Sequence, residues 1–239
     1  MINVLINGIE GKMGKVLLEQ IKSSDKFNCI GGVDINMPIS AVETIPDVII
    51  DFSVPTATFN ILEYAKGNNI PVVIATTGFS DEENSKISEY SKVIPIFKSA
   101  NMSYETNLLI SLVSKLATEL NGSDIEIVET HHNRKVDAPS GTALMIANGI
   151  NEALDNSMHY EYDRHSKRAP REKTEIGIHS IRGGTEVGKH TVFFFGDNES
   201  LEISHTVTSR AVFANGALKA AEFIINKPAG LYNMNDLIK

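Results

Sequence analysis

The sequence predicts an α/β protein whose parallel sheet carries helices on both faces, with an α+β region inserted into it. Through the first hundred residues, short apolar runs alternate with amphipathic stretches, which is the pattern of consecutive βαβ units. After residue 173, three strand-like runs follow one another with few helices between them, which favours a mixed or antiparallel sheet. A chain of 239 residues is long enough for one large domain or two small ones.

The first half of the chain is predicted to hold five strands joined by helices. The strands are expected at residues 2–6, 29–33, 48–52, 71–76 and 93–97. Residues 13–21 place apolar side chains at helical spacing, and Pro55 suits the first turn of a second helix. A third helix is expected after Ser80, because Ser80 and Glu83 have the spacing of a capping box.

The second half reads as two helices and four strands, closed by a last helix. Helices are expected at 104–120 and from near Ser140, and strands at 125–130, 174–182, 190–195 and 201–207. The last helix, 214–225, carries one apolar stripe and is expected to pack back on the first domain. The predicted nucleotide domain therefore comprises 1–102 plus 211–239, and the predicted substrate and oligomerisation domain comprises 103–210.

Composition excludes several classes of protein. The chain has 22 Lys and Arg against 30 Asp and Glu, a net charge of −8, which argues against a general nucleic-acid binder. No apolar run is long enough to predict a membrane span. The single cysteine, Cys29, excludes an intramolecular disulfide and a multi-cysteine metal cluster. With no secretory leader pattern, the expected compartment is the cytoplasm.

A glycine loop follows the first predicted strand and opens the first helix. Gly8, Gly11 and Gly14 give the spacing G-x-x-G-x-x-G, and Asp34 ends the second strand, 20 residues after Gly14. Such a loop lets the backbone approach a pyrophosphate, while the acidic residue bonds the adenosine ribose. This context predicts a Rossmann-like domain, with a ligand-free glycine turn as the alternative. Because no arginine follows Asp34, NADH is favoured, with NADPH also possible.

Residues 129–142, between a strand end and a helix start, contain the largest group of side chains that could act in catalysis or bind an anion. His131, His132, Arg134 and Lys135 crowd one loop of an acidic protein, which suits an anionic substrate. Ser140 starts a helix whose N-terminus offers a second anion site. Neighbouring histidines on a strand point to opposite faces and no third ligand stands nearby in sequence, so no metal is expected. Hydride addition to a C=C–C=N system requires a proton donor, a role that suits histidine.

The stretch from Glu129 to Leu144 resembles the signature of the dihydrodipicolinate reductase family, also called 4-hydroxy-tetrahydrodipicolinate reductases. The resemblance covers nearly the whole chain and includes residues 8–14, 76–79, 99–102, 178–184 and 209–217. It implies reduction of 4-hydroxy-tetrahydrodipicolinate with NADH or NADPH in diaminopimelate and lysine biosynthesis. It also implies a homotetramer that assembles through the second domain's sheet, with two domains that close over cofactor and substrate.

For the cofactor, the resemblance implies contacts in four segments. The glycine loop would hold the pyrophosphate and Asp34 the ribose; residues 75–77 would line the nicotinamide; residues 99–102 would close over the cofactor. Ala75 departs from the glycine common in the family. The implied cofactor residues are Gly8, Ile9, Glu10, Gly11, Lys12, Met13, Asp34, Ala75, Thr76, Thr77, Ser99, Ala100, Asn101 and Met102.

For the substrate, a small dicarboxylate, the resemblance implies His131 as proton donor and Lys135 as a second donor or substrate anchor. His132, Gly141 and Thr142 would contact the carboxylates. His179, Arg182 and Arg210 are interpreted as structural residues and left out of the site. Two other functions fit the same residues: an NAD-dependent dehydrogenase of another small dicarboxylate or amino acid, and a non-catalytic module that senses NAD.

Overall fold

The computed structural model describes residues 1–238, which form two compact units. Unit 1 contains residues 1–104 together with the segment from Arg210 onward, and unit 2 is Glu105–Ser209. Unit 2 is therefore continuous in sequence, whereas unit 1 is completed by the end of the chain. No helix among the described residues is long and apolar enough to cross a membrane.

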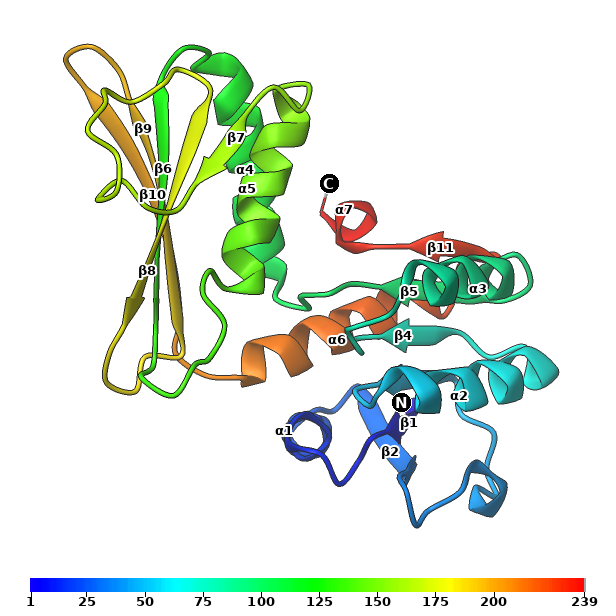
Figure 1. The fold of residues 1–239 in the computed structure, drawn as a ribbon. Helices are drawn as coiled ribbons and strands as arrows, with labels where there is room; N and C mark the ends of the chain where they lie inside the picture. The colour runs from blue at the N-terminus through cyan, green and yellow to red at the C-terminus, as the bar shows by residue number, and fades with distance from the viewer. Residues whose placement is uncertain (239) are drawn as a thin grey trace. The chain divides into compact units, whose positions relative to one another are not determined.

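Unit 1 is built on a six-stranded sheet in which every neighbouring pair is parallel, in the order β11-β5-β4-β3-β1-β2 (Figure 1). The strands are β1 (Ile2–Asn7), β2 (Phe27–Val33), β3 (Val48–Asp51), β4 (Val72–Ile74), β5 (Pro95–Lys98) and β11 (Gly230–Tyr232). The chain runs from β1 to one side into β2 and then to the other side into β3. The strand order thus reverses between β1 and β3, and ligands of such sheets bind at the carboxyl ends of the strands beside that point.

Helices cover both faces of this sheet. The four long ones are α1 (Lys12–Lys22), α2 (Pro55–Asn68), α3 (Asp81–Ser91) and α6 (Ala211–Ile224). Apolar residues of α1 and α6 form one core with β1, β3 and β4, and those of α2 and α3 form another with the opposite sides of the same strands. Because both faces are buried, the strands read as continuous apolar runs such as Val4-Leu5-Ile6.

Local sequence signals set the starts of two of these helices, as predicted. Pro55 occupies the first turn of α2. Ser80 caps α3: its hydroxyl accepts from the Glu83 N–H at 3.2 Å, and its own N–H donates to the Glu83 carboxylate at 2.7 Å. The backbone N–H groups of Ser80 and Glu83, which have no acceptor within the helix, are both hydrogen-bonded in this way.

Unit 2 contains a five-stranded mixed sheet with strand order β10-β9-β6-β8-β7. Its elements are α4 (Tyr104–Glu119), β6 (Asp124–His131), α5 (Gly141–Ala153), β7 (His159–Glu161), β8 (Glu175–Arg182), β9 (Gly188–Phe195) and β10 (Ser200–Val207). The central strand β6 is parallel to β8 and antiparallel to β9. Helices α4 and α5 pack together on one face of the sheet (Figure 1), where they form the unit's core.

The predicted fold class is confirmed, with corrections to individual elements. The strand expected at 71–76 is only Val72–Ile74, and four short elements were not predicted: β7, β11, α7 (Met234–Leu237) and a 3-10 turn at Ile39–Ala41. The unpredicted strands at 159–161 and 230–232 lack the apolar runs, such as Val72-Val73-Ile74, that predicted the equally short strands β3, β4 and β5.

Candidate active site

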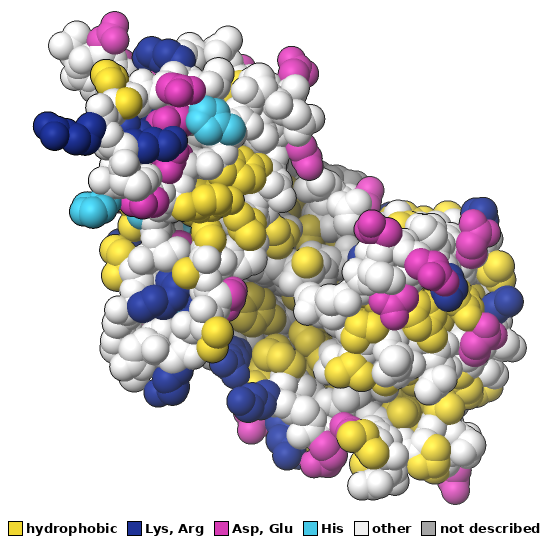
Figure 2. Space-filling view, viewed as in Figure 1, with side chains coloured by type: hydrophobic (Ala, Val, Ile, Leu, Met, Phe, Trp, Pro, Cys, Tyr) yellow, Lys and Arg dark blue, Asp and Glu magenta, His cyan; other side chains and the backbone are white. Residues whose placement is uncertain are grey.

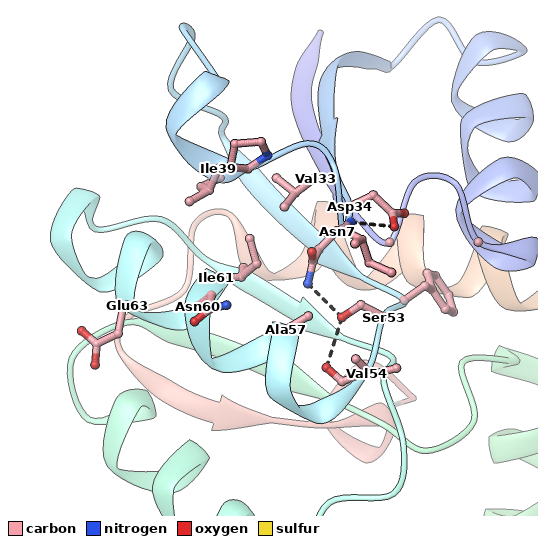
Figure 3. Close-up of a pocket in the computed structure, with 15 residues that line it drawn as sticks. Asn7, Val33, Asp34, Ile39, Ser53, Val54, Ala57, Asn60, Ile61 and Glu63 are labelled. Atoms are coloured by element: carbon pink, nitrogen blue, oxygen red, sulfur yellow. Dashed lines mark hydrogen bonds between the residues drawn. The ribbon is translucent and has the colours of Figure 1, made fainter.

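A cavity of about 770 Å³ opens in unit 1 beside the carboxyl ends of β1 and β3 (Figure 3). Three residues expected to bind a cofactor line it: Gly8, Gly11 and Asp34. The other lining residues were not predicted; they are Asn7, Val33, Ile35, Pro38, Ile39, Phe52, Ser53, Val54, Ala57, Asn60, Ile61 and Glu63. The position of β3 next to β1 was the available signal, because the turn after β3 must then lie beside the glycine loop.

The glycine loop has a backbone that only glycine fits. Gly8 has a φ of 82°, and a Cβ there would stand 2.5 Å from the Phe52 carbonyl oxygen. A Cβ at Gly14 would overlap the Gly8 carbonyl oxygen, so a side chain would push α1 away from the loop. Gly11 is the N-cap residue of α1, and no described side chain caps it. The uncapped helix start and the close backbone approach fit a dinucleotide pyrophosphate.

Asp34 lies at the end of β2 and faces the same cavity (Figure 3). Its carboxylate accepts the backbone N–H of Glu10 at 2.9 Å and that of Ile35 at 2.9 Å. The expected ribose-binding residue is thus tied directly to the glycine loop. Among the described residues, the cavity lining contains two carboxylates, Asp34 and Glu63, and no Lys or Arg. This charge pattern suits a free ribose diol better than a 2′-phosphate.

A buried carboxylate organises the floor of this region. Asp51, at the end of β3, accepts hydrogen bonds from Asn7 Nδ2 at 2.8 Å, Ser53 Oγ at 2.5 Å and Thr58 Oγ1 at 2.6 Å. Burial raises the pKa of Asp51, while these hydrogen bonds act in the opposite direction. The Ser53 N–H donates to Thr76 Oγ1 at 2.9 Å, so the carboxyl ends of β1, β3 and β4 are tied together.

The remaining predicted cofactor residues lie outside the cavity lining. Thr76 is buried, Ala75 half-buried and Thr77 exposed; Ile9 and Met13 are half-buried, and Glu10, Lys12 and Ala100 are exposed. Ser99 and Asn101 are buried, and Ser99 Oγ donates to the Asn101 carbonyl at 2.7 Å. The side chain of Met102 packs in the core of unit 1, so only its backbone is available to a cofactor.

Unit 2 places His131 at the end of β6, with 8% of its surface exposed. His131 Nδ1 lies 2.5 Å from Glu129 Oε2. Two residues apart on a strand, Glu129 and His131 share the face toward the core. An ionised carboxylate can only accept a hydrogen bond, so this contact favours the tautomer that carries its proton on Nδ1.

Glu129 is fully buried and also accepts hydrogen bonds from two other residues, Arg182 and Ser140. Arg182 donates to both of its oxygens, at 2.8 and 2.7 Å, and the Ser140 N–H donates at 3.2 Å. Burial alone would raise the pKa of Glu129, but the hydrogen bonds from Arg182, Ser180 and His131 outweigh it and lower the pKa to about 2. Arg182, interpreted from sequence as structural, is therefore part of the His131 environment.

His190 was not predicted at the site, and it bears on the argument about metals. Its Nε2 lies 3.0 Å from Ser140 Oγ, and its ring packs edge-on against His131 at 5.2 Å. Potential ligand atoms of Glu129, His131 and His190 lie within 4.8 Å of one another, so strand pairing brings a possible third ligand beside His131 that is remote in sequence. Arg182 nevertheless holds both oxygens of Glu129, and its cation disfavours a second positive charge there.

The loop after β6 brings Lys135 and the start of α5 into the same unit. Lys135 Nζ pairs with the Asp137 carboxylate at 2.8 and 2.9 Å, which lowers the pKa of Asp137. Ser140 caps α5 through a 3.1 Å bond from the Ala143 N–H, so Gly141 and Thr142 form the first turn. Nδ1 of His132 is a buried atom that has no hydrogen-bond partner within residues 1–238.

A cavity beside a glycine loop in one unit and a buried histidine–carboxylate pair in the other are features of a nicotinamide-dependent oxidoreductase. Family models agree with both units: "Dihydrodipicolinate reductase, N-terminus" matches residues 2–102, and "Dihydrodipicolinate reductase, C-terminus" matches residues 106–238. The chain belongs to the dihydrodipicolinate reductase family.

Curated relatives match over their full length. The chain is 51% identical to a 4-hydroxy-tetrahydrodipicolinate reductase of Caldanaerobacter subterraneus subsp. tengcongensis, covering 100% of this chain and 99% of that protein. It is 44% identical to one of Clostridium novyi, with the same coverage. Among solved structures, a dipicolinate-bound dihydrodipicolinate reductase from Paenisporosarcina sp. TG-14 matches all of both chains with a TM-score of 0.80 and 24% identity. An amine dehydrogenase from Mycobacterium smegmatis matches 98% of this chain and 95% of its own, with a TM-score of 0.55 and 11% identity, so it shares the fold alone.

Proposed function

We propose that this chain reduces 4-hydroxy-2,3,4,5-tetrahydrodipicolinate, in its dehydrated form, to 2,3,4,5-tetrahydrodipicolinate. The dehydrated substrate takes up one hydride from NAD(P)H and one proton, and NAD(P)⁺ is released. The observation that carries the proposal is a buried His131 whose Nδ1 is held by Glu129, in a family of dihydrodipicolinate reductases. The reaction belongs to diaminopimelate and lysine biosynthesis.

The cofactor supplies the hydride when it is bound in unit 1. The glycine loop would hold its pyrophosphate, and the carboxylate of Asp34 would accept from the ribose hydroxyls. Exposed Ile35 and the apolar residues Ile39 and Val54 line the cavity next to Asp34, as a flat base would require. We propose that NADH is preferred, because a 2′-phosphate would meet Asp34 without a compensating Lys or Arg in the described lining.

Residues of unit 2 would bind the dicarboxylate and supply the proton. Hydride addition leaves an electron-rich carbon next to the reduced bond, and Nε2 of His131 would protonate it. Lys135 would turn from Asp137 to a substrate carboxylate or act as a second donor. The N–H groups of Gly141 and Thr142 and the ring of His132 would bind the carboxylates, because a helix N-terminus favours negative charge. The Paenisporosarcina protein binds dipicolinate, a ligand of this class.

A homotetramer in the cytoplasm is proposed for this chain. Helices α4 and α5 cover one face of the unit 2 sheet, whereas the other face presents Ile181, Phe193 and Phe195. Ile181 is 51% exposed and Phe195 42%, and a hydrophobic sheet face is normally buried against another surface. Sedimentation equilibrium would measure the assembly state.

On the visible face in Figure 2, basic side chains are interspersed with acidic ones, so no broad basic surface is present there.

The test is cofactor oxidation in a coupled assay. Pyruvate and aspartate semialdehyde are condensed by the preceding synthase, and loss of the reduced cofactor's near-ultraviolet absorbance is followed with NADH and with NADPH. Rapid oxidation that depends on the synthase is expected, with the higher kcat/KM for NADH. Cofactor binding without oxidation would contradict the proposal and favour a sensing module, and turnover of free amino or hydroxy acids would favour another dehydrogenase.

Replacing His131 tests its role in the same assay. His131→Gln should lower kcat by about 10²-fold or more, the usual effect of removing a general acid, with the KM for NADH unchanged. An unchanged kcat would remove His131 from the mechanism.

A further inference from the structure

Glu129 occupies a position that the substrate and cofactor roles above do not use. Its side chain is fully buried, and its two oxygens receive hydrogen bonds from His131, from Ser140 and from two nitrogens of Arg182. An acidic side chain is rarely buried to this degree unless it is paired, so the sequence retains it at a cost in desolvation. The groups it binds belong to three segments: β6, β8 and the start of α5.

We propose that Glu129 is the positioning residue of the reaction: it fixes the tautomer and orientation of His131, and with Arg182 it aligns His131 with the carboxylate-binding loop and helix. The inference rests on the proposed role of His131 as proton donor. Glu129 itself touches neither substrate nor cofactor in this scheme and acts through His131.

The chemistry of the pair gives Glu129 two effects. First, its carboxylate accepts from Nδ1–H, so the mobile proton of the imidazolium is confined to Nε2. After that proton leaves, the neutral ring keeps its Nδ1–H bond to Glu129, and no rearrangement is needed. Second, the bond holds the ring in one orientation, so that Nε2 is turned away from Glu129.

Arg182 extends this alignment to the binding residues. Its Nη2 bonds Glu129 Oε1 at 2.7 Å and the Asp137 carbonyl at 2.8 Å, so the loop that carries Lys135 is fixed to the same carboxylate. The Ser140 N–H bond to Glu129 fixes the first turn of α5. One buried carboxylate therefore sets the relative positions of the proton donor and both anion-binding elements.

The experiment replaces Glu129 by glutamine, which keeps the shape and removes the charge. Glu129→Gln should lower kcat tenfold or more with the KM for NADH unchanged. The loss is expected because a glutamine amide can present either a donor or an acceptor to Nδ1, so the tautomer of His131 is no longer fixed. Glu129→Asp, which restores a carboxylate that only accepts, should recover part of kcat.

Three comparisons separate positioning from a general loss of structure. Glu172→Gln removes a carboxylate from an exposed Glu–His pair of the same unit, 4.0 Å from His159, and should leave kcat and its pH profile unchanged. In the His131→Gln background, Glu129→Gln should add less than a twofold loss of kcat, because the proton donor that it positions is already absent. A full additional tenfold loss of kcat there, or a wild-type kcat in Glu129→Gln, would overturn the inference. If His131→Gln itself kept full activity, the proposed function of His131 would fail instead.

A measurement on the unmodified protein covers the case in which Glu129→Gln does not fold. Nitrogen-15 NMR of histidine-labelled protein, assigned by the signals lost in His131→Gln, reports which ring nitrogen carries the proton. The neutral His131 ring should be the Nδ1–H tautomer. Finding the Nε2–H tautomer would overturn the inference.

Discussion

His190 packs its ring against His131 and turns its Nε2 toward the hydroxyl of Ser140. Burial lowers the pKa of His190 to about 4, and the charge of His131 adds to this effect. The folded protein therefore keeps His190 neutral at pH values where an unfolded chain has already protonated it. Below its ordinary pKa of 6.5, the proton favours the unfolded state, and stability declines until the pH reaches about 4.

We expect this one residue to contribute about 3 kcal/mol to the loss of unfolding free energy between pH 7 and pH 4. Urea unfolding of wild-type protein and His190→Gln across that range measures it, and the variant should show the flatter dependence. His165→Gln, at an exposed loop position, is the control and should follow the wild type. Equal slopes in wild type and His190→Gln would contradict the prediction. Glu129 affects the free energy of unfolding at lower pH, between its ordinary pKa of 4.5 and its pKa of about 2 in the folded protein.

Asp34 should decide between the two cofactors. Asp34→Ala removes the acceptor for the ribose hydroxyls and also removes a negative charge that would repel a 2′-phosphate. The KM for NADH should rise roughly tenfold, and the KM for NADPH should rise less or fall, because each lost hydrogen bond to a charged group is worth about 1.5–3 kcal/mol. Initial rates with both cofactors measure this, with exposed Asp25→Ala as control. An equal rise for both cofactors would mean that Asp34 acts only by holding the Glu10 N–H.

What the sequence could predict at this scale depended on proximity along the chain. His131, Lys135 and Ser140 stand within one short segment, so their residue types and spacing pointed to an acid and an anion site. Arg182 and His190 reach the same place from β8 and β9, and only the pairing of those strands with β6 brings them there. The buried position of Asp51 could not be predicted from the sequence either, because its hydrogen-bond partners Asn7 and Thr58 are brought to it by the fold.

At the scale of elements, the predicted strands and helices were found wherever periodicity or a capping signal was strong. Ser80 with Glu83 and the proline at the start of α2 are local signals, and local physics placed those helix ends correctly. Strand β11 lacks any such signal: it is three residues long, and it exists because β5 offers an edge for parallel pairing. Pairing partners of this kind are set by the whole fold and cannot be read from a short window.

Two glycines within helices give opposite predictions. Gly216 lies in α6, where a Cβ would overlap the Met102 carbonyl oxygen, whereas Gly67 lies in α2 with nothing near enough to meet a Cβ. Gly216→Ala should lower the free energy of unfolding by about 1–3 kcal/mol through overpacking. Gly67→Ala should raise it by about 0.5–1 kcal/mol, because alanine is the better helix former. Thermal melts of both variants measure the pair, and a stabilised Gly216→Ala would contradict the close approach of α6 to Met102.

At the scale of the molecule, the two units should respond to different ligands. NADH binds residues of unit 1 in the proposed function, and a ligand at 100 times its Kd stabilises the state that binds it by about 2.7 kcal/mol. Hydrogen exchange should therefore slow in the glycine loop and α1 when NADH is added. Dipicolinate should slow exchange in residues 132–139 and the first turn of α5. Protection of unit 2 by NADH alone to the same extent would contradict the separate assignment of the two half-sites.

The order of the two units along the chain also bears on how the protein is made. Unit 1 begins the chain, yet one of its cores needs Ala214, Ala217 and Ala221 of α6, which the ribosome adds only after all of unit 2. Until then, the apolar surface of β1, β3 and β4 that α6 covers is open to water and to other nascent chains. Unit 2 is contiguous, so all of its residues leave the ribosome before α6 does. The nucleotide-binding half is thus started first and finished last.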